Sequence, residues 1–291
     1  MLDCASPGVV HPSSTESDDM PAFPNGHFYS PVIDPQELHS RKSSLWSPRV
    51  PDPVAIDYRP AEQERLLREL GRYAADFDYP ETETGRGFFQ HNGKFEGLDA
   101  RLWFGLLRHL APARVIEVGS GFTTLLAADV IGRFLGGRTR LTCIEPYPPP
   151  FLGTVPGIEL IEAPVQSVPV ARFEDLADGD VLFIDSSHVS KTGSDVNYLY
   201  FDVVPRLAEG VILHIHDIFL PDEYPADWVL NEERSWNEQY VVQAMLMYSY
   251  GLEVLIASHY ASSRLGDAVA ESFGLHCGGG SLWLRKVVPS V

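Results

Sequence analysis

Positively charged residues are scarce in this sequence of 291 amino acids. It contains 22 Lys and Arg against 40 Asp and Glu, which gives a formal net charge of −18. A surface with this balance repels the phosphates of nucleic acids and the anionic head groups of lipids. We therefore expect neither nucleic acid nor a membrane as a partner.

Cysteine is also rare, and long apolar runs are missing. Cys4, Cys143 and Cys277 form neither a disulfide framework nor a zinc-binding spacing, so we expect a reducing cytoplasmic location. No apolar run approaches the ~20 residues that a membrane-spanning helix needs. The first residues lack the basic and apolar regions of a signal peptide, which agrees with this expectation.

Composition divides the chain into three parts. Residues 1–25 are rich in Ser, Pro and acidic residues and predict a disordered tail. Residues 26–60 keep many prolines but add aromatic residues, which predicts an arm or cap lying on the domain. Residues 61–291 alternate between two apolar periodicities, which predicts one catalytic domain.

These periodicities predict an α/β fold. Short apolar runs predict strands at 115–118, 140–144, 158–161, 181–184, 211–215, 252–257 and 281–285. Helical spacing predicts helices at 61–77, 98–110, 123–136, 194–207, 237–250 and 265–273. The alternation predicts a doubly wound, Rossmann-like sheet of seven mostly parallel strands with helices on both faces.

A glycine turn follows the first strand of this domain. The strand ends at Glu117-Val-Gly-Ser-Gly121, and a helix is predicted from Thr123. A strand, a glycine turn and a helix N-terminus together accommodate a nucleotide-like ligand. A dinucleotide fingerprint needs a third glycine where Thr124 stands, which disfavours an NAD-dependent oxidoreductase. Glu117 is placed to meet an ammonium group.

Polar residues also end the second and third strands, where ligands of such sheets bind. Glu145 lies 24 residues after Gly121 and is suited to accept both ribose hydroxyls of an adenosine. It could instead be a solvated carboxylate at a strand end. Gln166 and Ser167 follow the third strand, where this architecture contacts an adenine edge.

The fourth and fifth strands end in acidic residues and histidines. If these strands are neighbours, their ends lie ~5 Å apart. Asp185 and Asp217 are then within reach of one divalent cation, with His188 and His216 beside them. Hard oxygen ligands suit Mg²⁺, Mn²⁺ or Ca²⁺, and His188 is suited to take a proton from a hydroxyl. Alternatively, Asp217 only caps a turn and Asp185 only holds the amine of a cofactor. His214 is better interpreted as a core histidine.

Several motifs resemble one bacterial branch of the class I S-adenosylmethionine-dependent methyltransferases. They are the Phe28–Pro31 arm, Phe95–Asp99, Glu117–Phe122, Ile184–His188, Gly193–Asn197, His214–Phe219 and Trp236–Tyr240. The resemblance implies the fold and the cofactor, but not the substrate. It implies a cofactor site formed by Glu117, Gly119, Ser120, Gly121, Phe122, Thr123, Glu145, Gln166, Ser167, Asp185 and Ser186.

A more distant similarity is to metal-dependent O-methyltransferases of catechols and macrolide sugars. It implies that Asp185 and Asp217 bind a cation and that His188 acts as the base. The sequence departs from that pattern at His216, where a second acid is expected, and at Ile218, where an amide ligand is expected. We include His216 among the expected metal ligands.

The resulting hypothesis is an S-adenosylmethionine-dependent methyltransferase that acts on a small molecule, at an oxygen atom. The side chains expected to form the wall of the substrate pocket are Tyr29, Trp228, Trp236 and Tyr240, although each could simply pack as an ordinary aromatic residue. Other S-adenosylmethionine-consuming reactions and a non-catalytic binding module are the alternatives. The sequence does not determine the acceptor, the metal or whether the protein forms a homo-oligomer.

Overall fold

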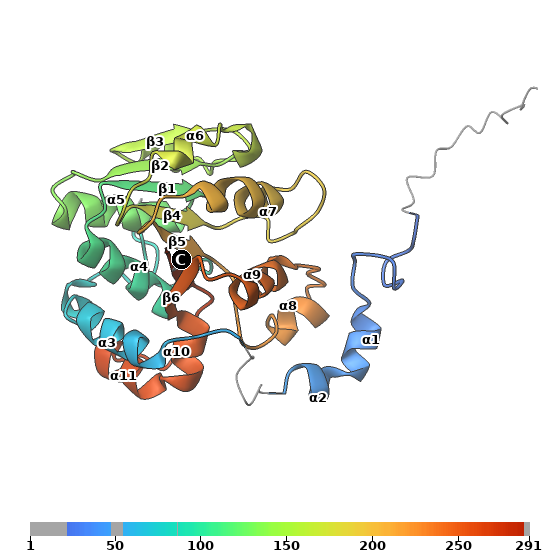
Figure 1. Cartoon of the computed structure of the whole chain (residues 1–291). Coiled ribbons are helices and arrows are strands. Elements are labelled where there is room, and N and C mark those ends of the chain that lie inside the picture. Colours follow the sequence, from blue (N-terminus) through green and yellow to red (C-terminus); the bar gives the residue numbers. More distant parts are fainter. Residues whose placement is uncertain (1–21, 48–54, 86, 288–291) are drawn as a thin grey trace, which may run out of the picture.

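The computed structural model describes residues 22–47, 55–85 and 87–287 (Figure 1). Residues 1–21 of the disordered tail predicted over residues 1–25 therefore lie outside the described residues. In the described ranges, no helix combines the length and the apolar character that crossing a membrane requires.

The centre of the fold is one seven-stranded sheet, as predicted. Its strands are β1 (Arg114–Val118), β2 (Arg140–Ile144), β3 (Ile158–Ile161), β4 (Val181–Ile184), β5 (Ile212–Ile215), β6 (Leu252–Ala257) and β7 (Leu282–Lys286). The strand order is β3-β2-β1-β4-β5-β7-β6. The first five strands are parallel, and β7 is inserted antiparallel between β5 and β6.

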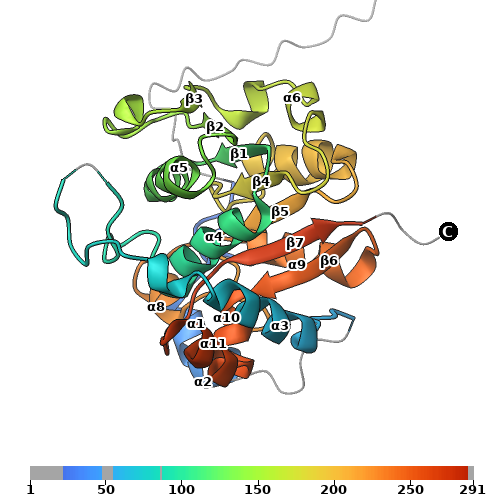
Figure 2. The same cartoon turned by 90° about the vertical axis from the view of Figure 1, so that its left-hand side faces the viewer.

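Helices cover both faces of this sheet. One face carries α3 (Pro60–Gly71), α4 (Gly97–Leu110), α5 (Phe122–Phe134), α10 (Ser258–Arg264) and α11 (Gly266–Phe273). The other carries α6 (Ala171–Glu174), α7 (Asp195–Asn197) with its continuation to Arg206, and α9 (Glu238–Tyr248). Figure 2 shows α4 and α5 in front of the sheet, and Figure 1 shows α7 and α9 on the opposite side.

The strands explain why two separate cores form. Side chains alternate between the faces of a strand, so Phe183 of β4 packs with Trp103 of α4, whereas Leu182 and Ile184 pack with the opposite face. All four residues of β4 are buried, as expected for a strand covered on both sides. A central strand of this kind holds its carboxyl end in a fixed position.

The helix predicted over residues 194–207 is less regular than expected. It begins as α7, widens over Tyr198–Val203 to a π-helical segment, and tightens over Val204–Arg206 to a 3₁₀ turn. Pro205 has no N–H to donate to the carbonyl four residues earlier, so a regular α-helix cannot continue through it. The short α8 (Ala226–Leu230) was not predicted, because five residues are too few to show a helical period.

The described part of the arm lies against the domain through α1 (Pro35–Ser40) and α2 (Lys42–Leu45), beside α8 (Figure 1). Asp34 begins α1 by accepting hydrogen bonds from the backbone of the first turn. Trp46 then donates its indole N–H to the carbonyl of Tyr224 at 2.7 Å. The arm therefore reaches the domain mainly through its second half.

Candidate active site at the carboxyl ends of the strands

The candidate site lies where the parallel strands β1, β2, β4 and β5 end. Backbone hydrogen bonds continue the ladder past the strand ends and fix the next residues in place. Gly119 N–H donates to Ile144 O at 3.0 Å, and Asp185 N–H donates to Val118 O at 2.8 Å. His216 N–H donates to the carbonyl of Ile184 at 2.9 Å. The loops after these strands are therefore rigid where the polar side chains begin.

The glycine turn needs Gly119 for a steric reason. Its φ is +78°, and a Cβ at this position would lie 1.9 Å from the carbonyl oxygen of Asp185. A Cβ on Gly121 would meet only open space, so the turn leaves room for a ligand at the start of α5. Thr124, which replaces the third glycine of a dinucleotide site, donates its hydroxyl to Glu117 at 2.5 Å and ties α5 to β1.

Glu117 is a fully buried carboxyl with one unpartnered oxygen. Its Oε2 accepts from the hydroxyl of Thr124, whereas Oε1 has no hydrogen-bond partner among the described residues. Burial raises the pKa of this carboxyl to about 7, against the opposing hydrogen bonds from Thr123 and Thr124. The nearby Ser120 hydroxyl is likewise buried without a partner. Buried polar groups are normally satisfied, so these two atoms indicate a ligand.

Glu145 joins the loops after β1 and β2. Its two carboxylate oxygens accept from the backbone N–H groups of Tyr147 at 2.8 Å and Ser120 at 3.2 Å. The carboxylate is only partly buried and keeps further lone pairs. Gln166 and Ser167 lie exposed in the loop after β3, where the Gln166 amide donates to Gly193 O at 3.0 Å.

The remaining residues expected at the cofactor site lie around this turn. Phe122 is the first residue of α5, and its ring packs against those of Phe89 and Phe151. Thr123 is buried next to it, with its carbonyl facing the indole of Trp103 at 3.4 Å. The residues expected from β1, β2 and β4 therefore lie at neighbouring strand ends, whereas no described contact joins Gln166 or Ser167 to them.

His188 is surrounded by three carboxylates. Its Nδ1 lies 2.8 Å from Glu238 Oε2, and its Nε2 lies 3.3 Å from Asp185 Oδ1 and 3.5 Å from Asp217 Oδ2. The ring is buried and packs against Trp236, with 4.2 Å between the ring centroids. The predicted adjacency of the β4 and β5 ends is confirmed by the pairing of Ile184 with Ile215.

Glu238 is the site residue that sequence reasoning missed. It is fully buried at the start of α9 and also accepts from the hydroxyls of Ser186 at 2.9 Å and Tyr200 at 2.7 Å. The available signal was an acidic residue opening an otherwise apolar helix, within the Trp236–Tyr240 motif. Glu238 is therefore positioned to set the orientation and the tautomer of His188.

The carboxylates hold both histidines in the charged form. Burial opposes the charge, but hydrogen bonds to Asp185 and Glu238 raise the pKa of His188 to about 10. Burial also opposes the charge of His216, yet Asp217 and Asp185 raise its pKa to about 9. In return, His216 and His188 lower the pKa of Asp185 against the effect of burial. In the protein alone, two imidazolium ions balance this acidic cluster.

Two of these residues have unusual backbone geometry. His188 has φ = 60° and Asp217 has φ = 58°, in the left-handed region that non-glycine residues rarely adopt. Such conformations cost on the order of 1–3 kcal/mol each and concentrate at functional sites. The fold holds them because the strand ladder and the packing on both sides leave no alternative.

A possible metal centre lies in the same cluster. One ligand atom each from Asp185, His216 and Asp217 lies within 4.8 Å of the others. Within the described ranges, neither ring nitrogen of His216 has a partner at hydrogen-bond geometry; its Nδ1 lies 3.3 Å from Asp217 Oδ1 and 3.7 Å from Asp185 Oδ1. Two carboxylates and an imidazole are a donor set that a divalent cation accepts.

His214, two residues earlier, has a structural role, as predicted. It is fully buried, and its Nε2 lies 3.0 Å from the hydroxyl of Ser281. Burial holds its pKa well below the ordinary value, so this ring is neutral. It stacks on Phe183 with 3.7 Å between ring centroids, and it belongs to the core.

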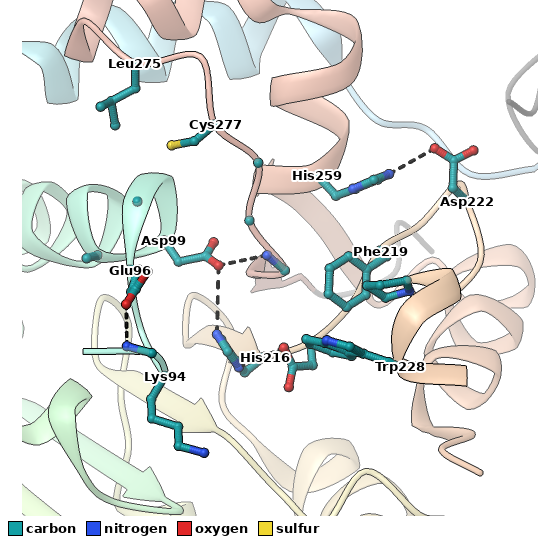
Figure 3. A pocket seen from close by; sticks show the side chains of 18 of the residues that line it. Lys94, Glu96, Asp99, His216, Phe219, Asp222, Trp228, His259, Leu275 and Cys277 are labelled. Carbon is teal, nitrogen blue, oxygen red and sulfur yellow. Dashed lines mark hydrogen bonds and ion pairs between the residues drawn. The ribbon is translucent and has the colours of Figure 1, made fainter. Parts of the chain in front are cut away.

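A pocket of about 910 Å³ opens beside this cluster. His216 and Asp217 lie at its base, and aromatic side chains form much of its wall (Figure 3). Figure 3 shows Phe219 and Trp228 on one side of His216, with Lys94 on the other. The aromatic residues of the wall are Trp46, Phe77, Phe219 and Trp228. The pocket suits a small molecule with an apolar body.

The expected wall residues require correction. Of the four, only Trp228 lines the pocket, while Trp236 lies against His188. Tyr29 is 65% exposed, and its ring contacts those of Phe28 and His27 within the arm, with centroid distances of 4.0 and 5.6 Å. Tyr240 donates its hydroxyl to Glu223 and lines a separate surface hollow. Trp46 takes the place that was expected for Tyr29.

The strand order, with an antiparallel seventh strand and an acidic residue after β2, defines a Rossmann-like transferase fold. A family model described as "Methyltransferase domain" matches residues 116–218. An uncharacterised protein of Archaeoglobus fulgidus is 37% identical over 183 residues, which are 58% of this chain and 82% of that protein. The chain belongs to the class I S-adenosylmethionine-dependent methyltransferases, and it is an enzyme of that kind.

Two solved structures are similar at low sequence identity. A Podospora anserina methyltransferase bound to S-adenosylhomocysteine has 14% identity and a TM-score of 0.44, over 87% of this chain and 94% of that chain. A putative methyltransferase from Thermobifida fusca has 14% identity and a TM-score of 0.41, over 81% of this chain and 97% of that chain. At these scores neither similarity indicates an acceptor.

Proposed function

We propose that this enzyme transfers the methyl group of S-adenosylmethionine to a hydroxyl oxygen of a small molecule. The observation that carries the proposal is the meeting of Asp185, His188 and Asp217 next to an aromatic-lined pocket whose lining includes Asp217. His188 Nε2 lies 3.3 Å from Asp185 Oδ1 and 3.5 Å from Asp217 Oδ2. Such a cluster can orient a hydroxyl and accept its proton beside the glycine turn.

The residues around the turn fit the cofactor. The unpartnered Glu117 Oε1 and Ser120 hydroxyl match an ammonium and a carboxylate, the two groups of an amino acid end. Glu145 keeps acceptor capacity for a ribose, and the open space at Gly121 admits the ligand backbone. When bound, S-adenosylmethionine supplies an electrophilic sulfonium methyl group. The protein then has to position an acceptor and remove one proton.

We assign the proton to His188 Nε2. Glu238 accepts from Nδ1–H, which leaves Nε2 facing Asp185 and Asp217, and Asp217 lines the pocket. Because His188 is cationic in the protein alone, it must lose a proton before it can accept one. A divalent cation on Asp185, His216 and Asp217 would reduce the negative charge that raises the pKa of His188. We therefore include such a cation, Mg²⁺, Mn²⁺ or Ca²⁺, in the proposal.

A metal-free arrangement uses the same residues. His216, as an imidazolium between Asp185 and Asp217, then supplies the positive charge that the cation would supply. The two arrangements respond differently to chelation. EDTA abolishes turnover in the first, with restoration by added cation, and has no effect in the second.

Incubation with S-adenosylmethionine and a panel of hydroxylated acceptors tests the function. The expected products are S-adenosylhomocysteine and an acceptor heavier by one methyl group, both measured by mass spectrometry. Asp185→Asn should reduce both products together. Formation of methylthioadenosine in place of S-adenosylhomocysteine would instead establish a displacement reaction without methyl transfer and contradict the proposal.

A further inference from the structure

Arg101 of α4 lines the pocket without an acidic partner. Its guanidinium stacks on Phe77, with Cζ 4.4 Å from the ring centroid, and Nη2 donates to Gln90 Oε1 at 3.1 Å. Its Nε is buried and has no hydrogen-bond partner in the part of the chain that the structure describes. No described carboxylate lies within ion-pair distance of this side chain. A partly desolvated guanidinium in this state is costly.

The other described arginines that stack on aromatic rings each have a carboxylate partner, which Arg101 lacks. Arg108, on the same helix, also pairs with Asp76 at 2.7 Å. Arg133 pairs with Asp78, and Arg234 pairs with Glu232. Among the described arginines with such stacking, Arg101 alone has no carboxylate partner, although the chain contains 40 acidic residues.

The pocket is not short of carboxylates, but each of them is already engaged. Asp99 accepts from Gly280 N–H and Ser281 N–H, at 2.8 and 3.1 Å. Asp222 pairs with His259 at 2.9 Å. The remaining carboxylates of the wall are Glu96, which accepts from Gly93 N–H, Glu223, which accepts from Tyr240, and Asp217, which faces His188 and His216. None of these described carboxylates forms an ion pair with Arg101.

We propose that Arg101 binds a carboxylate of the methyl acceptor, so that the acceptor is a hydroxylated acid with an apolar body. This rests on the proposed function, because it takes the pocket as the acceptor site. The planar fork of a guanidinium matches a carboxylate through two parallel hydrogen bonds. Lys94, the other lysine or arginine that lines the pocket, is exposed and already interacts electrostatically with Asp185. A single negative charge therefore fits this acid-rich pocket better than a phosphate dianion.

The test is a binding experiment that needs no turnover. Naphthalene-2-carboxylate, its primary amide and naphthalene-2-phosphonate are titrated calorimetrically into the full-length protein. The carboxylate should bind about tenfold or more tightly than the amide, the usual share of one charge-assisted pair. It should also bind more tightly than the phosphonate. Equal binding of acid and amide, no binding of the acid, or a preference for the phosphonate overturns the inference.

Variants locate the effect. Arg101→Met should remove the preference for the acid, and Arg101→Lys should retain part of it. Arg138→Met removes the same charge from an exposed site with no described side-chain partner, and it should keep the full preference. Retained preference in Arg101→Met overturns the assignment. S-adenosylmethionine binding to the wild-type protein is measured in parallel. If the wild type does not bind S-adenosylmethionine, the proposed function is contradicted. If it binds S-adenosylmethionine but does not prefer the acid to the amide, only the role given to Arg101 is contradicted.

Discussion

Replacement of Glu238 by Gln should slow methyl transfer while leaving the cofactor site intact. Three donors converge on this carboxylate: Tyr200 OH on Oε1, and Ser186 Oγ and His188 Nδ1 on Oε2. An amide of the same shape has one acceptor oxygen and an NH₂ group. The NH₂ must then face at least one of these donors, so the buried network cannot be fully satisfied.

The magnitude follows from the bond to His188. A hydrogen bond to a charged group contributes roughly 1.5–3 kcal/mol. His188 becomes charged when it accepts the proton of the acceptor hydroxyl. If the contribution of this hydrogen bond is lost in that step, the rate constant of methyl transfer falls by about 10- to 100-fold. The affinity for S-adenosylmethionine should barely change, because Glu238 touches none of the residues assigned to the cofactor except Ser186.

The variant should also change the pH dependence of stability. A raised histidine pKa stabilises the fold fully below pH 6.5, and this stabilisation is lost as the pH rises towards 10. The shift of the His188 pKa from 6.5 to about 10 corresponds to at most about 5 kcal/mol. In EDTA, the unfolding free energy of the wild type should therefore decline over this window. The decline should be smaller in Glu238→Gln.

Single-turnover kinetics and chemical denaturation from pH 6 to 10 measure these two effects. Tyr200→Phe removes one donor to Glu238 but keeps its charge, so its rate should fall much less. Glu64→Gln removes a charge on the outer surface of α3 and should change neither property. A Glu238→Gln enzyme with wild-type transfer rate and an unchanged pH profile would refute the role given to the His188–Glu238 pair.

Three further predictions concern the cofactor site and the metal. Glu145→Ala should weaken S-adenosylmethionine binding by roughly 1.5–3 kcal/mol in calorimetry, and an unchanged affinity would remove Glu145 from that site. Dialysis against EDTA should abolish turnover and Mn²⁺ or Mg²⁺ should restore it, whereas full activity in EDTA would favour His216 as the positive group. Burial raises the pKa of Glu117 from 4.5 to about 7. Ionisation of this buried carboxyl therefore destabilises the fold progressively as the pH rises from 4.5 to about 7. Glu117→Gln should therefore gain up to about 3 kcal/mol over wild type at pH 8, but nothing at pH 4, in denaturation without cofactor.

The sequence by itself determined the sheet and the place of the site. Short buried runs such as Val181–Ile184 can only be strands covered on both faces, and Gly119 marks the turn because no other residue fits it. The carboxyl ends of parallel neighbours meet at one edge. Asp185, His188 and Asp217 were therefore predictable as one cluster once β4 and β5 were taken as adjacent.

Other features were decided only by tertiary packing. Periodicity reports burial, not direction, so it could not show that β7 runs antiparallel between β5 and β6. His214 and His216 point to the same side of one strand, and only their neighbours make the first a neutral core ring and the second a charged site residue.

The partners of charged side chains were equally hidden, because they come from distant parts of the chain. Glu238 reaches His188 across 50 residues, and no local pattern encodes that contact. Tyr29 could be assigned to the pocket from composition, but the path of the arm places Trp46 there instead. That Arg101 has no described carboxylate partner follows only from the tertiary structure, because it depends on how the carboxylates of the pocket wall are placed relative to its guanidinium.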